Sequence, residues 1–338
     1  MIIVMKKGAP EEHIQNIILE LTSLGLQPLP LYGTERTVIA VIGDERVIDE
    51  RSLTALPGVS KVMSVLQPFK LASRESKFED TIIEIKGEKI GGRNLTVIAG
   101  PCSIESEKQL FDIAFKCKNA GTRFLRGGAF KPRTSPHQFQ GMGVEGLKIM
   151  KKVCDELDMI SVSEVMDARD VEVVCQHIDI LQIGARNMQN FTLLKEVGKT
   201  KNPVLLKRGS SATIKEFLLA AEYIMAEGNP NVILCERGIR TFETDTRNTL
   251  PLATVPLIKE LSHLPIIVDP SHGTGVRAFV ASMSRAAVAA GADGLAIEVH
   301  TDPDKSITDA DQTISCEAFA SLMDEIKPIA TAVGKSLK

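Results

Sequence analysis

The sequence predicts an α/β protein in which a (β/α)₈ barrel of the TIM type follows a small βαββαβ domain of ferredoxin-like, or ACT-like, pattern. From residue 95 onward, short apolar runs alternate eight times with stretches of helical spacing. The apolar runs are continuous, as in parallel strands that are buried on both faces. No GxGxxG motif follows the first run, which argues against the alternative of an open doubly wound sheet.

Each of the eight apolar runs is followed by a segment long enough for a helix, as a closed (β/α)₈ barrel requires. The strands are expected at residues 95–99, 123–125, 160–162, 180–183, 204–206, 232–234, 266–268 and 295–297. The helices are expected at residues 107–119, 145–157, 168–176, 191–197, 214–227, 254–261, 278–289 and 317–333. In such a barrel the residues just past the strands meet at one end, so functional side chains are expected there.

Residues 1–66 follow a different pattern. MIIVMKK is typical of a strand, and residues 11–24 carry apolar side chains at helical spacing before Gly25. Two strands, LQPLPLY and TVIAVIG, a short helix over 47–53 and a strand over 59–65 complete the βαββαβ order. The region holds no cluster of His, Cys or paired carboxylates. Either a stabilising or oligomerising appendage or a regulatory ligand-binding module fits it.

The expected boundaries follow from these patterns. Residues 1–66 form the small domain, and residues 67–81, which contain Pro68 and several charges, form a linker. The barrel takes residues 82–338, and its first segment, IIEIKGEKI, is predicted to be a hairpin that turns at Lys86-Gly87.

Composition excludes several classes of function. The 338 residues carry 25% charged side chains, a net charge of −3 and no Trp, which argues against nucleic-acid binding. No apolar run approaches the roughly 20 residues that cross a bilayer. Six cysteines occur without a CxxC pair, and no signal segment precedes them. These features predict a protein of the reducing cytoplasm.

The loop TRFLRGGAFKPRTSPHQFQG at residues 122–141 is the first candidate binding site. Arg126, Lys131 and Arg133 follow a predicted strand, together with two hydroxyls and the pair Gly127-Gly128. Arg offers a planar fork of donors, Lys a point charge, and Gly lets a ligand approach the backbone, so the loop suits a phosphate. The alternative is an ordinary solvated basic loop.

The predicted strand ends collect further cations. The full set is Arg126, Lys131, Arg133, Arg186, Lys207, Arg208 and Arg237. Like charges repel, so a site holding them implies a polyanionic ligand such as one with two phosphates and a carboxylate. One or two of these cations are expected to pair with a carboxylate, for example Arg208 or Arg237 with Glu236.

A second set at the strand ends fits a metal ion. It contains Cys102, His272 and Glu298, with a fourth ligand from the segment DPDKSITDADQ, whose carboxylates are Asp302, Asp304, Asp309 and Asp311. Thiolate, imidazole and carboxylates suit a divalent ion of the Mn, Fe, Co or Zn type. The rival hypothesis is a Cys–His nucleophile and base, which the phosphate-binding cations favour less.

The motifs AGPCSIE, LRGGAFKPRTSPHQFQG, QIGARNMQNF, LLKRG, ILCERGIRTFE, TRNTL, VDPSHGTG and EVH occur in order over most of residues 95–311. In this order and spacing the chain resembles the 3-deoxy-D-arabino-heptulosonate 7-phosphate (DAHP) synthases, of the short bacterial type with a ferredoxin-like N-terminal domain. The resemblance implies a transferase that condenses phosphoenolpyruvate with erythrose 4-phosphate, releasing phosphate, in the first step of the shikimate pathway to the aromatic amino acids.

The resemblance also implies roles for individual residues. The divalent metal would be bound by Cys102, His272, Glu298 and Asp309, although Asp311 remains an alternative to Asp309. Phosphoenolpyruvate would be held by Arg126, Lys131, Arg186, Lys207 and Arg237, and the phosphate of the aldose by Arg133, Thr134 and Ser135. Lys131 and His272 are both candidates for catalytic proton transfer, and the sequence does not choose between them.

Two other functions stay open at this point. The sister enzyme that makes 3-deoxy-D-manno-octulosonate 8-phosphate from arabinose 5-phosphate resembles the same barrel, but it has KANRS where this chain has KPRTS. A non-catalytic sensor of phosphosugars or amino acids would lack a complete metal set. The family resemblance further implies feedback inhibition by tyrosine or phenylalanine and a homotetramer.

Overall fold

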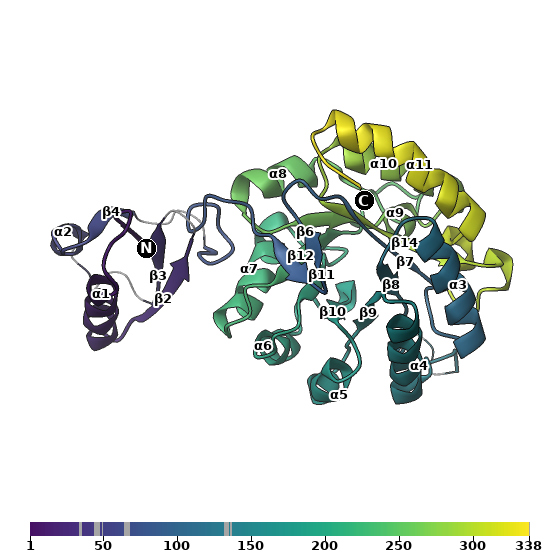
Figure 1. Cartoon of the computed structure of the whole chain (residues 1–338), viewed down its shortest axis with the longest axis horizontal. Coiled ribbons are helices and arrows are strands. Elements are labelled where there is room, and N and C mark those ends of the chain that lie inside the picture. The colour runs from purple at the N-terminus through teal and green to yellow at the C-terminus, as the bar shows by residue number, and fades with distance from the viewer. Residues whose placement is uncertain are drawn as a thin grey trace. The chain divides into compact units, whose positions relative to one another are not determined.

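The computed structural model describes residues 1–33, 36–43, 48, 50–63, 68–131, 135 and 137–337. The chain divides into two compact units (Figure 1). One comprises Met1–Asp80 with Glu260–His263, and the other comprises Thr81–Lys259 with Leu264–Lys338. The linker expected at residues 67–81 stays a prediction, because residues 64–67 lie outside the described part of the chain.

The N-terminal unit has the predicted βαββαβ order. Its elements are β1 (Ile2–Met5), α1 (Glu11–Ser23), β2 (Gln27–Tyr32), β3 (Thr37–Ile42), α2 (Glu50–Thr54) and β4 (Val59–Met63). The sheet order is β2-β3-β1-β4, and its pairings are antiparallel. The ferredoxin-like pattern is therefore confirmed. Val47, the expected start of the second helix, and the expected strand end at 64–65 lie outside the described residues.

The core of this unit follows from the spacing in the sequence. Ile14, Ile17 and Leu21 recur every three or four residues, so they share the face of α1 that is buried with Ile3 and Ile39 of the sheet. The helix ends before Gly25, whose φ of 76° is a left-handed conformation that glycine adopts without strain.

The second unit is a closed barrel of eight parallel strands in its described residues. The strands are β7 (Thr96–Gly100), β8 (Phe124–Arg126), β9 (Ile160–Glu164), β10 (Ile180–Ile183), β11 (Val204–Lys207), β12 (Val232–Glu236), β13 (Ile266–Val268) and β14 (Gly294–His300). Neighbours in the sequence pair in order, and β14 pairs with both β13 and β7, which closes the sheet. The predicted (β/α)₈ fold is thus confirmed.

Helices surround the strands, as Figure 1 shows. They are α3 (Glu107–Asn119), α4 (Gly143–Glu156), α5 (Val171–Cys175), α6 (Phe191–Gly198), α7 (Ile214–Ala226), α8 (Thr254–Leu261), α10 (Val280–Ala289) and α11 (Cys316–Ala332). Side chains fix several starts. The Ser106 hydroxyl accepts from the backbone N–H of Gln109, and Thr213 and Glu216 form a capping box. No helix among the described residues is long and apolar enough to span a membrane.

Two predicted helices are not continuous. The segment expected at 168–176 begins as a 3₁₀ turn, Ala168–Asp170, before α5, and Arg277–Phe279 forms another before α10. The short α9 (Pro270–Thr274) and β15 (Ile314–Ser315) were not predicted. Segments of two to five residues show no period, so the sequence pattern cannot reveal them.

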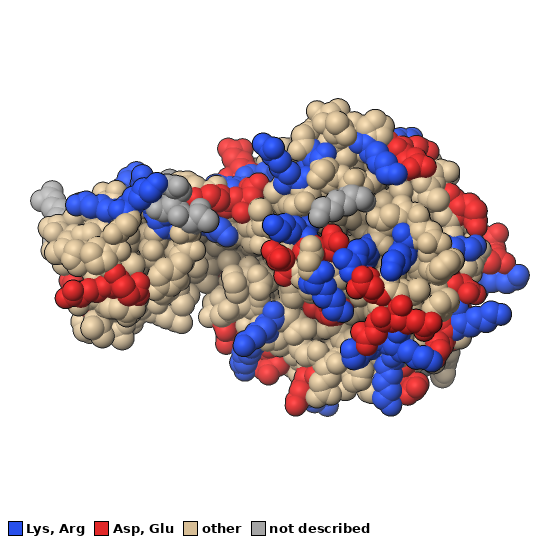
Figure 2. All heavy atoms as spheres, viewed as in Figure 1, with Lys and Arg blue, Asp and Glu red and all other residues tan. Residues whose placement is uncertain are grey.

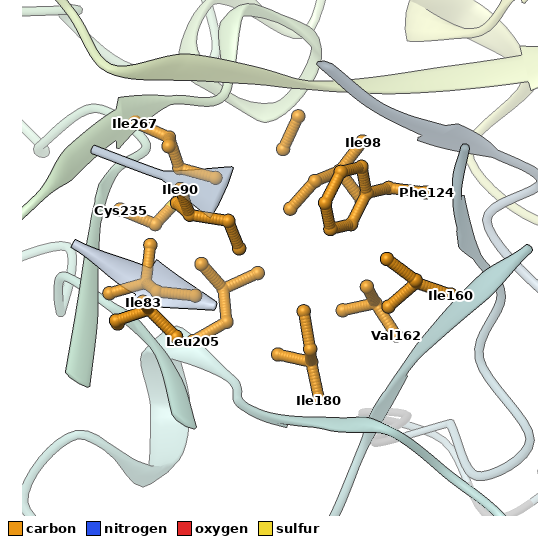
Figure 3. Packing of buried hydrophobic residues seen from close by; sticks show 12 residues of the cluster. Ile83, Ile90, Ile98, Phe124, Ile160, Val162, Ile180, Leu205, Cys235 and Ile267 are labelled. Carbon is orange, nitrogen blue, oxygen red and sulfur yellow. The ribbon is translucent and has the colours of Figure 1, made fainter. Parts of the chain in front are cut away.

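A hairpin fills one end of the barrel. Its strands are β5 (Ile83–Ile85) and β6 (Glu88–Ile90), joined by the predicted turn at Lys86 and Gly87, where φ is 46° and 79°. Ile83 and Ile90 are buried with side chains of the barrel strands, including Phe124, Ile180 and Leu205 (Figure 3). On the face of the barrel unit seen in Figure 2, basic and acidic side chains are interspersed.

The hairpin supplies a test of this packing. Ile83→Ala should lower the free energy of unfolding by about 2–5 kcal/mol, because it removes a buried side chain and leaves a cavity in a close-packed core. Ile82 is 52% exposed in the same hairpin, so Ile82→Ala should change that free energy by only about 0.5 kcal/mol. Urea unfolding of both variants measures the difference. Equal destabilisation would show that the hairpin does not seal the barrel core.

Candidate active site

A cavity of about 370 Å³ lies at the carboxyl end of the barrel strands. Among its lining residues, cations outnumber acids: the cations are Arg126, Lys131, Arg186, Lys207, Arg237, Arg240 and Arg247, and the acids are Glu164 and Asp309. Uncharged polar groups, among them Gln182 and Asn248, complete the wall. Such a wall favours a ligand with several negative charges.

The strands place these cations. Arg126 and Lys207 are the last residues of β8 and β11, and Arg237 directly follows β12. Arg186 lies in the 3₁₀ turn after β10. Because parallel strands end on the same side of a barrel, side chains far apart in the sequence reach one cavity. These four positions were expected from the sequence for the same reason.

Close backbone approach also shapes the wall. Glu164, the last residue of β9, lies against Gly184, where an added Cβ would be 2.1 Å from Glu164 Oε1. Its Oε2 accepts a hydrogen bond from Gln182 Nε2 at 3.2 Å. Only a glycine at position 184 leaves room for this carboxylate in its observed place.

Two of the cavity cations have buried acidic partners. Arg126 Nη1 donates to Glu298 Oε1 at 2.7 Å, and Lys207 Nζ donates to Asp269 Oδ2 at 2.5 Å. Glu298 and Asp269 are fully buried. A charge removed from water needs such a partner, since an isolated buried ion is strongly unfavourable.

A third pair confirms the expectation that Arg208 or Arg237 pairs with Glu236, and it is Arg208 that does so. Arg208 donates to Glu236 Oε2 at 2.6 Å and to the Ala212 carbonyl, and it is not among the residues that line the cavity. The other oxygen of Glu236, Oε1, accepts a hydrogen bond from the backbone N–H of Gly238 at 2.8 Å. Arg237 lines the cavity instead. Among the predicted cations in the described part of the chain, Arg126, Lys207 and Arg208 thus form buried pairs with acids, which is more than the one or two expected.

The predicted metal-ligating residues form a cluster. Ligand atoms of Cys102, Glu298 and Asp309 all lie within 4.8 Å of one another. Cys102 Sγ is 3.0 Å from Asp309 Oδ2, whereas Asp311 is exposed. His272 adjoins this group, with Nε2 3.5 Å from Glu298 Oε1. Its Nδ1 is 2.8 Å from Asp269 Oδ2, a contact that directs Nε2 towards Glu298.

Asp309 has an unusual backbone. Its φ of 51° and ψ of 39° are left-handed, a conformation that costs energy for residues other than glycine. Neighbouring groups stabilise the turn: Thr313 Oγ1 donates to the Asp309 carbonyl at 2.8 Å, and Arg277 Nη2 donates to the Ala310 carbonyl at 2.8 Å. The fold thus holds this carboxylate beside Cys102 against a local preference.

Burial and neighbouring charges set the protonation of the cluster. Burial, reinforced by Glu298, raises the pKa of the Cys102 thiol to about 12. Burial alone would raise the pKa of Glu298, but His272 and Arg126 hold this pKa below its ordinary value. Burial lowers the pKa of His272. A carboxylate, a neutral imidazole and a thiol that must lose its proton form a donor set that fits a divalent cation of intermediate softness.

Lys131 connects the two parts of the site. Its Nζ is 3.0 Å from both Cys102 Sγ and the Cys102 carbonyl oxygen, and the side chain also lines the cavity. Gly128 allows this position, because a Cβ there would lie 2.9 Å from Lys131 Cδ. A single ammonium group therefore touches the cluster and faces the anion-binding cavity.

None of the predicted residues of the aldose phosphate site is among the described residues of the cavity wall, whereas two unpredicted arginines are. Arg133 and Thr134 lie outside the described residues, and Ser135 is described but does not line the cavity. Arg240 and Arg247 were missed. Both follow Arg237 in the same loop after β12, so extending the search along each loop would have found them.

Fold and site together define an enzyme-like barrel whose mouth holds anion-binding cations beside a thiol–carboxylate cluster. The model of the DAHP synthetase I family matches residues 79–332, and that of the DAHP synthase ferredoxin-like domain matches residues 1–67. The chain belongs to the DAHP synthetase I family, a family of enzymes.

Similar proteins agree with this membership. A phospho-2-dehydro-3-deoxyheptonate aldolase of Thermotoga maritima is 48% identical and covers 99% of each chain. The crystal structure of a DAHP synthase from Thermotoga maritima has a TM-score of 0.80 at 47% identity and covers 100% of this chain and 99% of its own. A 2-dehydro-3-deoxyphosphooctonate aldolase of Geobacter sulfurreducens is only 31% identical, over 73% of this chain and 97% of its own.

Proposed function

We propose that the protein condenses phosphoenolpyruvate with erythrose 4-phosphate to give DAHP and phosphate, the first step of the shikimate pathway. One observation carries the proposal: the cationic cavity adjoins the Cys102–Glu298–Asp309 cluster in a chain 48% identical to the Thermotoga aldolase over nearly its full length. Both substrates are phosphorylated, and phosphoenolpyruvate adds a carboxylate. The excess of cations in the cavity matches that charge.

Phosphoenolpyruvate is assigned to the deeper cations, namely Arg126, Lys131, Arg186, Lys207 and Arg237. Arg126 and Lys207 are held by Glu298 and Asp269 before any ligand arrives. Donors that are already in place need little reorganisation during the reaction, so they stabilise developing charge more effectively than mobile ones. Burial lowers the pKa of Arg237. An anionic ligand beside this guanidinium would raise the pKa again, because it stabilises the charged form.

The aldose phosphate is assigned to Arg133, Thr134 and Ser135 on the family resemblance, two of which lie outside the described residues. Arg240 and Arg247 lie in the wall of the same cavity and supply further positive charge. An exposed cation at a cavity mouth speeds the arrival of anionic substrates, and Arg240 is exposed.

The divalent cation is assigned to Cys102, His272, Glu298 and Asp309. The sulfur, nitrogen and oxygen donors of these residues fit an ion of the Mn, Fe, Co or Zn type. When bound, such an ion would polarise the aldehyde carbonyl as a Lewis acid. The second contact of His272, from Nδ1 to Asp269, keeps Nε2 directed at this position.

In the reaction, C3 of phosphoenolpyruvate forms a bond to the aldehyde carbon, and the aldehyde oxygen takes up a proton. Positive charge develops at C2, water adds there and loses a proton, and the C2–O bond to phosphate breaks. Arg126 and Lys207 hold the anionic groups in line with the aldehyde, which makes the step effectively unimolecular. Lys131 and His272 are the candidates for moving the two protons, since both line the cavity.

The choice of aldose is the decisive experiment. Phosphate release from phosphoenolpyruvate should be fast with erythrose 4-phosphate and much slower with arabinose 5-phosphate under matched conditions. The reason is the loop KPRTS, which differs from the KANRS of the octulosonate enzymes, whose similarity to this chain is also lower. A preference for arabinose 5-phosphate would establish the alternative, and no release with either aldose would favour a sensor.

Removal of the thiol tests the metal assignment. Cys102→Ala should abolish metal-dependent activity while the thermal unfolding midpoint stays near that of the wild type, because one ligand is lost from an otherwise folded barrel. Cys154→Ala is the matched control, since Cys154 is also buried but lies on α4. Full activity of Cys102→Ala in the presence of a chelator would remove the metal hypothesis.

The N-terminal unit is proposed to bind an aromatic amino acid, tyrosine or phenylalanine, that inhibits the barrel. The match of residues 1–67 to the family's ferredoxin-like domain supports a distinct module. A homotetramer is proposed on the same family basis. The six unpaired cysteines fit a reducing compartment such as the cytoplasm.

A shortened chain tests the regulatory proposal. A variant that begins near Arg74 should keep catalytic activity but lose inhibition by tyrosine and phenylalanine, because the proposed effector module is absent. A truncated form of the Thermotoga maritima enzyme, which covers 79% of this chain with a TM-score of 0.75, has been solved as a folded structure. Initial rates with and without each amino acid give the comparison. Inhibition that persists in the variant would place the effector site in the barrel.

A further inference from the structure

Gln312 makes one buried and one half-buried side-chain contact that the proposed reaction does not use. It follows Asp309 in the turn after β14, and only 2% of its surface is exposed. Its Nε2 donates to Glu298 Oε2 at 2.6 Å, and its Oε1 accepts from Arg247 Nη1 at 2.9 Å. A carboxylate only accepts and a guanidinium only donates, so these partners fix which way the amide points.

The contact with Glu298 orients a whole carboxylate. Arg126 donates to Oε1, the oxygen that also faces His272, while Gln312 donates to Oε2. With a donor on each oxygen, the carboxylate plane is fixed on both sides. Removing Gln312 would leave Oε2 without this donor and would let the group turn about its terminal bond.

The contact with Arg247 extends this arrangement to the cavity wall. Arg247 lines the cavity, and its Nη1 lies 3.5 Å from Asp309 Oδ1 as well as 2.9 Å from Gln312. The guanidinium of Arg247 therefore contacts one predicted metal ligand, Asp309, directly and a second, Glu298, through the side-chain amide of Gln312. An anion bound to Arg247 would be linked to Glu298 by two hydrogen bonds.

We propose that Gln312 is a positioning residue of the metal centre: its amide fixes the carboxylate of Glu298 and ties it to Arg247 in the substrate cavity. The inference rests on the proposed function, because it requires that Glu298 bind the metal. Outer partners that orient a metal ligand commonly change metal affinity without touching the ion.

The test compares full-length wild type with Gln312→Met, which keeps the approximate volume of the side chain but removes both hydrogen bonds. Co²⁺ is titrated into the metal-free proteins and followed by its thiolate charge-transfer and visible absorption bands. Gln312→Met should bind Co²⁺ about 10–100-fold more weakly, with shifted visible bands. With saturating Co²⁺, kcat should fall while the KM for phosphoenolpyruvate stays close to the wild-type value, since Gln312 does not line the cavity.

Two further variants make the result specific. Lys305→Met changes an exposed side chain in the same segment after β14 and should leave both the Co²⁺ spectrum and its affinity at wild-type values. Arg247→Met leaves the bond from Gln312 to Glu298 but removes the link to the cavity, so it should shift the Co²⁺ bands in the same direction. If Gln312→Met does not fold, the Arg247→Met variant is used in its place. Unchanged Co²⁺ bands in Arg247→Met would then overturn the proposal.

Three outcomes would count against the inference. Co²⁺ affinity within about twofold of wild type, with an unchanged spectrum, in a folded Gln312→Met protein would show that the amide does not position Glu298. Equal effects of Gln312→Met and Lys305→Met would mean that any change in this segment disturbs the centre. Absence of the thiolate band in the wild type would refute the metal centre and this inference with it, whereas the condensation itself is tested separately by the comparison of the two aldoses.

Discussion

The buried pair of Arg126 and Glu298 is the interaction on which the rest of the site depends. Neither group could remain charged at the end of the barrel alone, because burial penalises an unpaired ion. Paired, the two fix each other, and Glu298 then presents its carboxylate to Cys102, His272 and Asp309. Lys207 and Asp269 repeat the arrangement beside them. The positions of the reactive groups are therefore set by electrostatic necessity as much as by packing.

These pairs leave the cavity short of negative charge. Arg126 and Lys207 have carboxylate partners, and cations outnumber acids among the residues of the wall. A ligand with two or three negative charges would balance the positive charge of this wall. Binding of such a ligand would therefore also stabilise the folded state. A ligand that binds only the folded state stabilises it in proportion to the logarithm of its concentration.

The sequence predicted the barrel, the order of its strands and the meeting of Cys102, His272 and Glu298, because buried parallel strands leave continuous apolar runs with functional residues at their ends. The choice of Asp309 among four carboxylates came from the family resemblance. The sequence left open whether Arg208 or Arg237 pairs with Glu236, and it did not predict that the adjacent Lys207 pairs with Asp269. Partners are set by three-dimensional burial, which a linear pattern does not contain. Short elements such as α9 could not be predicted, because five residues are too few to show a helical period of apolar side chains.

The β5–β6 hairpin has a consequence for access to the cavity. It closes one end of the barrel with Ile83 and Ile90, so molecules enter and leave the cavity through the other end. Arg126 and Lys207 lie deep and are nearly covered, whereas Arg240 is exposed. A barrel closed at one end leaves its cavity a single approach from solvent, and the exposed Arg240 lies nearer that approach than the buried Arg126 and Lys207. The apolar side chains of the hairpin thus decide from which side the charged wall can be reached.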